Sequence, residues 1–536
     1  MREPDAGARF SSGVRVDGQL EGRPDVSLSP SQCVAVTTTP GTEAPSAERS
    51  VGTRTMRGMV WAYGSYVGGR LLVLVATAIL ARLLNPDDFG VVALALVFTG
   101  LLYTIRDFGV TQALIVAPEE EVSARADSAF VFSLLLGVAL SAIVLALSPL
   151  AALFFHEPEL KTLLPLLGLS FVTRSFGTTH YALAQRRLDF RSRTAAEFAD
   201  VFVRGFASIG FALAGLGAYS LVLGYVVGEL ALSLAMWALV PWRPRLRLER
   251  QQLAPLLGFG GALTGVDVLA AVYQNVDYVF VGRVLGTAAL GVYTLAFRLP
   301  DLIINNLTIV ASTVLFPAFA LVERSALRDA YLTTIRYTVM LTLPLAVALA
   351  ILAEPFILAA FGEKWRGAVT PMQILVLYAL FPAMTTPPGV IYKAIGRADI
   401  LLKLALIRTP LLIAALALFV DRGITAVAAC QAGVVVIFFF VTTAIASRML
   451  EVTLREIGAA VWPPVAASGV LALALVAVHR VIEAPWPALA VGTIVGGGVY
   501  LGALWLLAPD ALRELRARIG RRGPSPQPEP SATTVR

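Results

Sequence analysis

Charged and amide side chains interrupt two apolar runs between residues 261 and 301, each near the length of a membrane-crossing helix. The side chains that could carry chemistry there are Asp267, Gln274, Asn275, Asp277, Arg298 and Asp301. An ionisable group at membrane depth costs about 2.5 to 3.5 kcal/mol on insertion scales, so it usually faces a protein interior or a watery cavity. This stretch therefore predicts the wall of a polar cavity inside a membrane protein.

The spacing of these residues sorts them by helix face. Gln274 lies seven residues after Asp267, which places both on one side of a helix. Asn275 lies eight residues after Asp267, which is a net rotation of only about 80° about the helix axis. Asp277 lies ten residues after Asp267, a rotation of about 280°, and is expected to face a neighbouring helix. We predict that Asp267, Gln274 and Asn275 line the cavity.

The acids Asp267 and Asp277 are also the candidates for coupling transport to an ion. A buried carboxylate that binds H⁺ or Na⁺ with different affinity in two conformations biases the equilibrium between them. The alternative for Asp277 is a buried ion pair that only fixes helix packing. Beyond a coupling ion we expect no cofactor, and the two cysteines match no metal-binding spacing.

Two arginines within apolar runs are candidates for binding substrate. Arg70 lies in SYVGGRLLVLV beside two glycines, and Arg298 lies in the second run of the opening stretch. A guanidinium donates hydrogen bonds in pairs and stays charged, which suits phosphate. We therefore predict Arg70, Arg298, Gln274 and Asn275 as substrate-binding residues. The alternative for each arginine is a structural pair with a carboxylate or a position near the lipid surface.

Other charged residues and two glycines lie near predicted helix ends, where structural or gating roles are expected. These residues are Arg82, Gly90, Arg106, Asp107, Arg283 and Gly291. Arg82 would pair with Asp87 and Asp88 and cap a link, and Arg106 with Asp107 would close a helix. Arg174 and Arg204 would extend towards the cytoplasm along their helices.

The composition predicts an all-α polytopic membrane protein. Of 536 residues, 57% are hydrophobic and 15% are charged, and the mean hydropathy is +0.75, which leaves too little polar surface for a soluble chain. The net charge of +7 does not indicate a nucleic-acid partner, because the basic residues lie in short clusters between apolar runs.

Apolar runs and polar links divide the chain into five parts. We predict a disordered tail at 1–55, two six-helix lobes at 57–254 and 255–450, two further transmembrane helices at 451–510, and a basic, Pro-rich cytoplasmic tail at 511–536. The fourteen predicted spans are 59–81, 90–112, 127–154, 162–184, 195–215, 218–241, 258–282, 289–315, 331–353, 368–394, 399–420, 424–446, 461–479 and 486–508. Lys and Arg gather in alternate links, which predicts that both termini are cytoplasmic.

A short repeat relates the two predicted lobes. Residues 82–95 read RLLNPDDFGVVALA and residues 283–296 read RVLGTAALGVYTLA, aligned without gaps at an offset of 201. Both copies lie in the link between the first two helices of a set of six. The repeat predicts two lobes of the same topology, as in many transporters; the alternative is chance similarity between two Leu- and Gly-rich segments.

The motifs ARLLNPDDFGVVALALVF, RDFGVTQALI and QNVDYVFVGRVLGTAALGVYTLAFRL resemble the Wzx-type polysaccharide and lipopolysaccharide exporters. These flippases belong to the multidrug/oligosaccharidyl-lipid/polysaccharide exporter superfamily, and the resemblance covers about residues 57–450. It implies transport of an undecaprenyl-pyrophosphate-linked oligosaccharide, a lipopolysaccharide or exopolysaccharide precursor, across the bacterial cytoplasmic membrane. The implied partners are this lipid-linked substrate, membrane lipids and other polysaccharide assembly proteins.

Two other functions remain open at this point. One is a cation-coupled drug exporter of the same superfamily. The other is an integral-membrane glycosyltransferase or polymerase, which would use the same lipid substrate. Enzyme activity is not expected, because the chain has no P-loop, HExxH or GxSxG motif and its three histidines are isolated.

Overall fold

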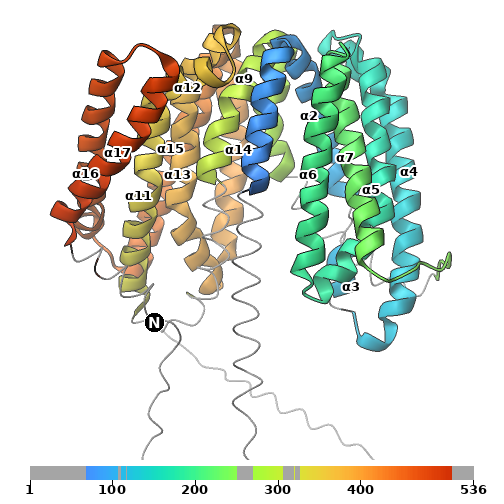
Figure 1. Ribbon diagram of the computed structural model, residues 1–536. Helices are drawn as coiled ribbons and strands as arrows, with labels where there is room; N and C mark the ends of the chain where they lie inside the picture. Colours follow the sequence, from blue (N-terminus) through green and yellow to red (C-terminus); the bar gives the residue numbers. More distant parts are fainter. Residues whose placement is uncertain are drawn as a thin grey trace, which may run out of the picture. The chain divides into compact units, whose positions relative to one another are not determined.

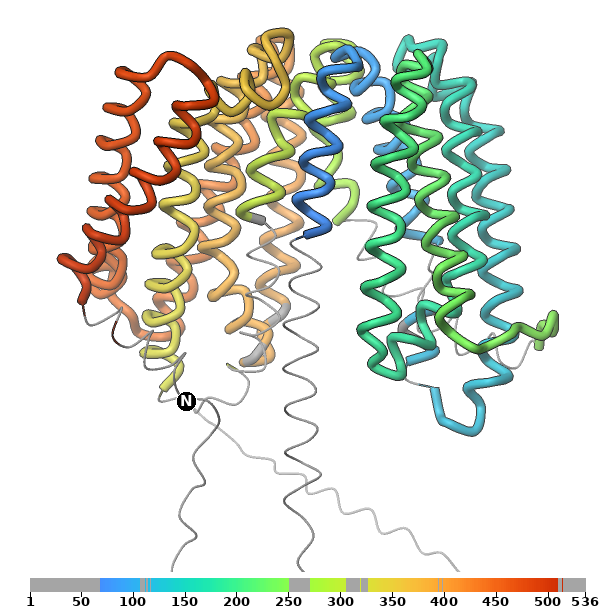
Figure 2. Tube along the Cα trace, viewed as in Figure 1, coloured from blue at the N-terminus to red at the C-terminus, as the bar shows by residue number. Residues whose placement is uncertain are grey.

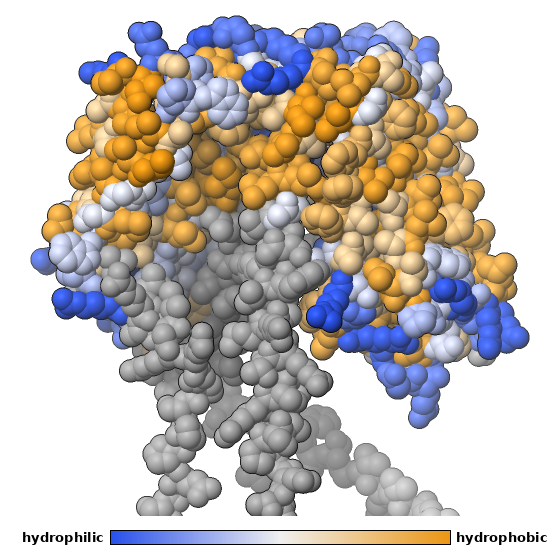
Figure 3. All heavy atoms as spheres, viewed as in Figure 1, coloured by the Kyte–Doolittle hydropathy of each residue, from blue (hydrophilic) through white to orange (hydrophobic). Residues whose placement is uncertain are grey.

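The computed structural model describes residues 68–106, 110–115, 117–249, 270–305, 319, 326–509 and 513. Within these ranges every regular element is a helix, and ten helices are long and apolar enough to cross a membrane. Figure 3 shows a surface that is largely hydrophobic between hydrophilic edges. The described part of the chain is therefore that of an all-helical membrane protein, as predicted, while the predicted tail 1–55 and all of the tail 511–536 except Arg513 lie outside the described residues.

The N-terminal segment, residues 68–249, is built from helices that pack in pairs. After helical residues 68–83 it contains α2 (Pro86–Arg106), α3 (Val110–Ile115), η1 (Glu119–Glu121), α4 (Val122–Phe155), α5 (Leu160–Arg186), α6 (Phe190–Leu213) and α7 (Ala218–Leu239). Helix α4 packs on α5, and α7 packs on both α5 and α6 (Figure 1). Pro86 occupies the first turn of α2, where its missing N–H costs nothing.

The C-terminal segment, residues 270–509, begins with helical residues 270–284. It continues with α9 (Thr287–Pro300), η2 (Asp301–Asn305), α11 (Leu327–Ile351), α12 (Ala353–Ala360), η4 (Glu363–Ala368), α13 (Val369–Ala394), α14 (Ala398–Phe419), η5 (Val420–Arg422), α15 (Ile424–Leu450), α16 (Leu454–Val481) and α17 (Pro485–Leu507). Helix α13 packs on α15, while α16 and α17 lie side by side against α11 (Figure 2).

Most helix ends differ from the predicted spans by a few residues, and the reasons are local. Helix α16 begins at Leu454 rather than at the predicted residue 461, because Thr453 and Glu456 form a capping box. Hydropathy alone cannot detect such a polar first turn. In the predicted spans 162–184 and 195–215, charged side chains interrupt the apolar pattern, yet both regions are continuous helices, α5 and α6.

The two copies of the sequence repeat meet where α2 packs on α9. A Cβ atom on Gly90 would lie 1.9 Å from the Thr287 carbonyl oxygen, and one on Gly291 would lie 1.9 Å from the Pro86 carbonyl oxygen. The two glycines therefore allow a backbone contact that no other residue permits. A single buried apolar cluster, which includes Leu94 and Leu290, continues across this contact and joins the two segments.

Arg82 does not form the predicted pair with Asp87 and Asp88. Its guanidinium instead donates hydrogen bonds to the carbonyl oxygens of Ala359 and Ala360 at the end of α12. The last turn of a helix leaves carbonyl groups without partners inside the helix, and a cation satisfies them well. Arg82 therefore ties the N-terminal segment to the C-terminal one.

Candidate functional site

A cavity of about 610 Å³ lies between α2, α5 and helical residues 270–284. We call it the polar cavity, because Tyr103, Arg106, Arg174, Tyr181, Gln274 and Asn275 are among the residues that line it. Gln274 and Asn275 thus occupy a cavity wall. The Asn275 side chain donates a hydrogen bond of 2.8 Å to the Ala271 carbonyl oxygen, which leaves its own amide oxygen available to a ligand.

Arg106 is the cation with the most unused hydrogen-bonding capacity in this cavity. The residue is 8% exposed, and its guanidinium lies 3.7 Å from the centre of the Tyr103 ring. Its Nε and Nη1 atoms are buried, and neither finds a hydrogen-bond partner in the described part of the chain. Unpaired buried donors are costly, so a ligand with oxygen acceptors would be stabilised here.

One buried carboxylate, Glu229 of α7, holds two further arginines in place. Its oxygens lie 3.4 Å from Nη1 of Arg174 and 3.6 Å from Nη2 of Arg204, and the Tyr103 hydroxyl donates to it at 3.1 Å. Arg204 also makes three hydrogen bonds, of 2.8, 2.9 and 3.2 Å, to Asp200. Together with Arg106 the cluster has three cations and two anions, so it favours a negatively charged ligand.

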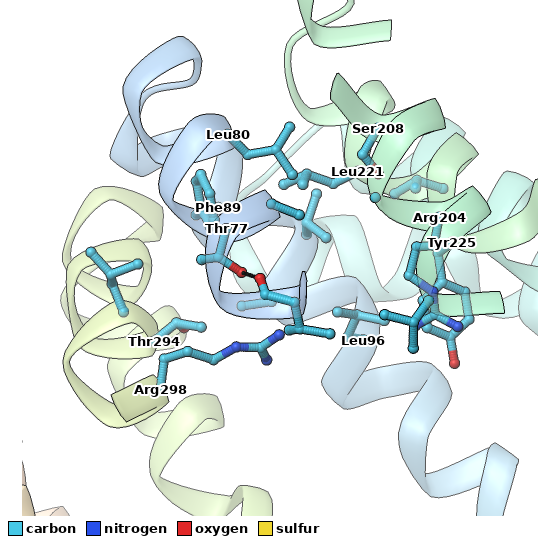
Figure 4. Close-up of a pocket in the computed structure, with 18 of the residues that line it drawn as sticks. Thr77, Leu80, Phe89, Leu96, Arg204, Ser208, Leu221, Tyr225, Thr294 and Arg298 are labelled. Atoms are coloured by element: carbon cyan, nitrogen blue, oxygen red, sulfur yellow. Dashed lines mark hydrogen bonds between the residues drawn. The ribbon is translucent and has the colours of Figure 1, made fainter. Parts of the chain in front are cut away.

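A second, more apolar cavity of about 340 Å³ lies between helical residues 68–83, α2, α6, α7 and α9. Arg204 and Arg298 line it from two sides, with Thr77, Leu96 and Tyr225 among its other walls (Figure 4). The Arg298 side chain is accessible from this cavity, and its guanidinium has neither a hydrogen bond nor an ion pair with any residue the structure describes. Glu229 binds arginines of both cavities and so links them.

Arg70 lines a third cavity, of about 480 Å³, with Arg193, Glu197 and Asp200. It therefore lies near carboxylates on α6 as well as near the neighbouring arginine. Both predicted alternatives for Arg70, phosphate binding and a structural pair, remain compatible with this position.

Asp277 faces α9, on the side that the helical rotation indicates. The residue is 1% exposed, and its Oδ2 atom accepts a hydrogen bond of 2.7 Å from the Tyr293 hydroxyl. Among the described residues it has no ion-pair partner, and its Oδ1 atom has no hydrogen bond. The side chain of Gln431 on α15 lies beside it. The alternative of a structural ion pair is thus not found among the described residues, and the partner of Asp277 is a tyrosine hydroxyl.

The remaining predicted residues lie away from these cavities. Arg283 lies over the Phe154 ring at 5.6 Å, and Gly90 and Gly291 form the helix contact described above. Asp267 and Asp107 lie outside the described residues, so their predicted roles stay predictions.

Sequence reasoning missed Glu229, although a signal was present. It is the only charged residue of α7. An ionisable group at membrane depth usually faces a protein interior or a cavity, and this rule applies to Glu229 as it does to Asp277. Arg106 was expected at a helix end, where it would serve structure. Nothing in the sequence shows that its side chain turns onto Tyr103 and into a cavity.

Comparison with known proteins identifies the class. Residues 79–370 match the family described as Polysaccharide biosynthesis protein, which is more than half of the chain. The succinoglycan biosynthesis transport protein ExoT of Rhizobium meliloti (strain 1021) is 30% identical over 69% of this chain and 74% of its own length. The lipopolysaccharide biosynthesis protein WzxC of Escherichia coli (strain K12) is 27% identical over 68% of this chain and 74% of its own.

This chain belongs to that polysaccharide biosynthesis family. Its fold is also that of a solved transporter, the lipid II flippase MurJ in an inward closed conformation. The two superpose with a TM-score of 0.72 over 85% of this chain and 100% of the other, at 14% identity. The predicted resemblance to polysaccharide exporters is confirmed by these matches.

Proposed function

We propose that this protein flips an undecaprenyl-pyrophosphate-linked oligosaccharide, a precursor of lipopolysaccharide or exopolysaccharide, across the bacterial cytoplasmic membrane. The observation that carries the proposal is Arg106, which presents two buried, unpartnered N–H groups beside Arg174 in the polar cavity. Diphosphate oxygens accept such paired donors, and amide side chains such as Gln274 and Asn275 suit sugar hydroxyls. The substrate's lipid chain would remain in the bilayer.

The relatives support transport rather than sugar transfer. Their names describe biosynthesis and transport of polysaccharides, and the fold is shared with a flippase. We therefore propose that the protein is not an enzyme and that it works with other polysaccharide assembly proteins.

We further propose alternating access between the two six-helix lobes, 57–254 and 255–450, with both termini in the cytoplasm and fourteen transmembrane helices in all. The glycine contact between α2 and α9 supports this layout, because equivalent positions of the repeat meet there. It provides a rigid point about which two similar halves could rock.

Asp277 is our candidate for the coupling ion, H⁺ or Na⁺. Its unpartnered Oδ1 atom and the unpartnered Oε1 atom of Gln431 are both buried. An acceptor of this kind is stabilised by a proton or a small cation. A change in the distance between α9 and helical residues 270–284 would alter the ion affinity and so couple it to conformation.

The proposed function is tested by deleting the gene and locating lipid-linked repeat units in the membrane. We expect these units to accumulate on the cytoplasmic leaflet and to return to the outer leaflet when the gene is restored. Normal outer-leaflet delivery in the deletion strain, with no related gene present, would contradict the proposal. Drug resistance on overexpression without an effect on polysaccharide would favour the drug exporter, and sugar transfer by the purified protein would favour the enzyme.

A further inference from the structure

A second arginine in the membrane region repeats the environment of Arg106. Arg408 lies near the middle of α14, and its guanidinium lies 4.0 Å from the centre of the Tyr273 ring. Its Nε atom is buried without a hydrogen-bond partner, and no carboxylate forms an ion pair with it in the described part of the chain. Arg106 on Tyr103 has the same arrangement, a stacked guanidinium with unused donors.

An uncompensated arginine at this depth requires an explanation. A charged group in the middle of a membrane helix is costly, and a contact with an aromatic ring offsets only part of that cost. Other membrane arginines of this chain, such as Arg174 and Arg204, are compensated by Glu229 and Asp200. Arg408 forms no such ion pair with any described residue. The Asp277 carboxylate lies one helical turn after Tyr273 but accepts its hydrogen bond from Tyr293, so Arg408 is left to an anion from outside the chain.

A cavity is present to receive this anion. It has a volume of about 250 Å³ and lies between α13, α14 and α15. Arg408 and the hydroxyl groups of Thr385 and Thr442 contribute its polar lining, and Leu404 and Phe438 contribute to its apolar lining. Thr385 already donates to the Pro382 carbonyl oxygen, whereas no hydrogen bond of the Thr442 hydroxyl is found among the described residues. Arg408 and Thr442 therefore bring donors without a partner among the described residues to the wall of a partly apolar space.

This cavity shares no lining residue with the polar cavity, and helical residues 270–284 contact the arginine of the one and line the other. Gln274 lines the polar cavity, while the preceding residue, Tyr273, turns away from it and stacks on Arg408. Successive residues on a helix point about 100° apart, so one helix can line the polar cavity and also contact Arg408. The two arginine–tyrosine pairs thus lie in different cavities.

We propose that Arg408 forms a second oxyanion site, which binds a phosphate group carried on an isoprenoid chain. The choice of a lipid-borne phosphate rests on the proposed function and on the apolar lining. A free phosphate ion offers the same oxygen acceptors, so the test includes both sources.

The test uses the purified, full-length protein in detergent and mass spectrometry of the intact protein with bound ligand. Farnesyl phosphate is the probe, farnesol is the control for its chain, and inorganic phosphate is the competitor. The wild type should bind two farnesyl phosphate molecules, one at Arg106 and one at Arg408. Arg408→Gln should retain one of them, with at least a tenfold weaker affinity at the lost site, and Arg422→Gln, an exposed arginine of the same region, should retain both.

The outcomes separate this inference from the proposed function. Loss of one ligand in Arg106→Gln but none in Arg408→Gln would overturn the second site and leave the proposed function intact. Loss of one bound farnesyl phosphate in Arg408→Gln, with none lost in Arg106→Gln, would support the second site and contradict phosphate binding in the polar cavity. If Arg408→Gln does not fold, Arg408→Met is measured instead, since it keeps the apolar stem of the side chain. Displacement of farnesyl phosphate from the Arg408 site by equimolar inorganic phosphate would show that the site binds free phosphate rather than a phosphate on an isoprenoid chain.

Discussion

Charged residues are arranged differently in the N-terminal and C-terminal segments. In the N-terminal segment Glu229 and Asp200 hold Arg174 and Arg204 in an ion-pair network. In the C-terminal segment Asp277 has a tyrosine as its partner, and Arg298 and Arg408 form no ion pair with any described residue. Most buried charges of the first segment are therefore fixed by ion pairs, with Arg106 as an exception, whereas Asp277, Arg298 and Arg408 of the second segment have no ion pair with a described residue.

The physical reason lies in the cost of burying charge. An ion-pair network fixes guanidinium groups in position, so a diphosphate would bind without first ordering them. An isolated buried carboxylate is stable only when neutralised, and its state therefore depends on what is bound beside it. Under the proposed function, the first segment would bind the substrate and the second would bind the coupling ion.

The largest effect is expected when the network of the N-terminal segment is broken. Glu229→Ala removes the carboxylate shared by Arg174 and Arg204 and leaves two partly buried cations less compensated. Removing one partner of a buried pair costs about 3 to 5 kcal/mol, and we expect about 3 kcal/mol here because both arginines keep some exposure. The measurement is the unfolding temperature of the purified protein. Glu363→Ala, which removes an exposed acid, is the control and should leave it unchanged.

A somewhat smaller effect is expected where the two segments meet. Gly90→Ala places a methyl group against the Thr287 backbone, which cannot move without separating α2 from α9. Overpacking costs about 1 to 3 kcal/mol, and a backbone clash belongs at the upper end. Yield and unfolding temperature should both fall. Gly100→Ala on the same helix, where a Cβ meets nothing within 4 Å, should behave as wild type, and equal behaviour of the two variants would refute the role of this contact.

The smallest effect on stability is expected at Asp277. Asp277→Asn keeps the size of the side chain and its contact with Tyr293, so about 1 kcal/mol or less should be lost. Transport should nevertheless lose its dependence on the coupling ion. Flipping in proteoliposomes with imposed H⁺ or Na⁺ gradients measures this, and a variant that still responds to both gradients as wild type does would exclude Asp277 as the ion site.

Hydropathy and charge predicted the membrane class and the positions of most helices, because both depend on local composition. The predicted start of α16 was wrong, because a capping box rather than hydropathy determines where this helix begins. In the structure Gln274 and Asn275 line the polar cavity and Asp277 contacts Tyr293, while Asp267, from which the predicted helix faces were counted, lies outside the described residues. The partners could not be predicted, because Tyr103 and Glu229 are 126 residues apart and one sequence does not record their contact.

The central claim, that the polar cavity binds the diphosphate of a lipid-linked sugar, is tested most directly at Arg106. Flipping of an isoprenoid-diphosphate-linked oligosaccharide is measured in proteoliposomes containing wild type, Arg106→Gln or Arg397→Gln, the last an exposed arginine outside the cavity. A charged hydrogen-bonding group contributes about 1.5 to 3 kcal/mol, so Arg106→Gln should slow flipping at subsaturating substrate by at least about tenfold. Arg397→Gln should flip at the wild-type rate. Equal rates for Arg106→Gln and wild type, with equal amounts of folded protein, would contradict the account.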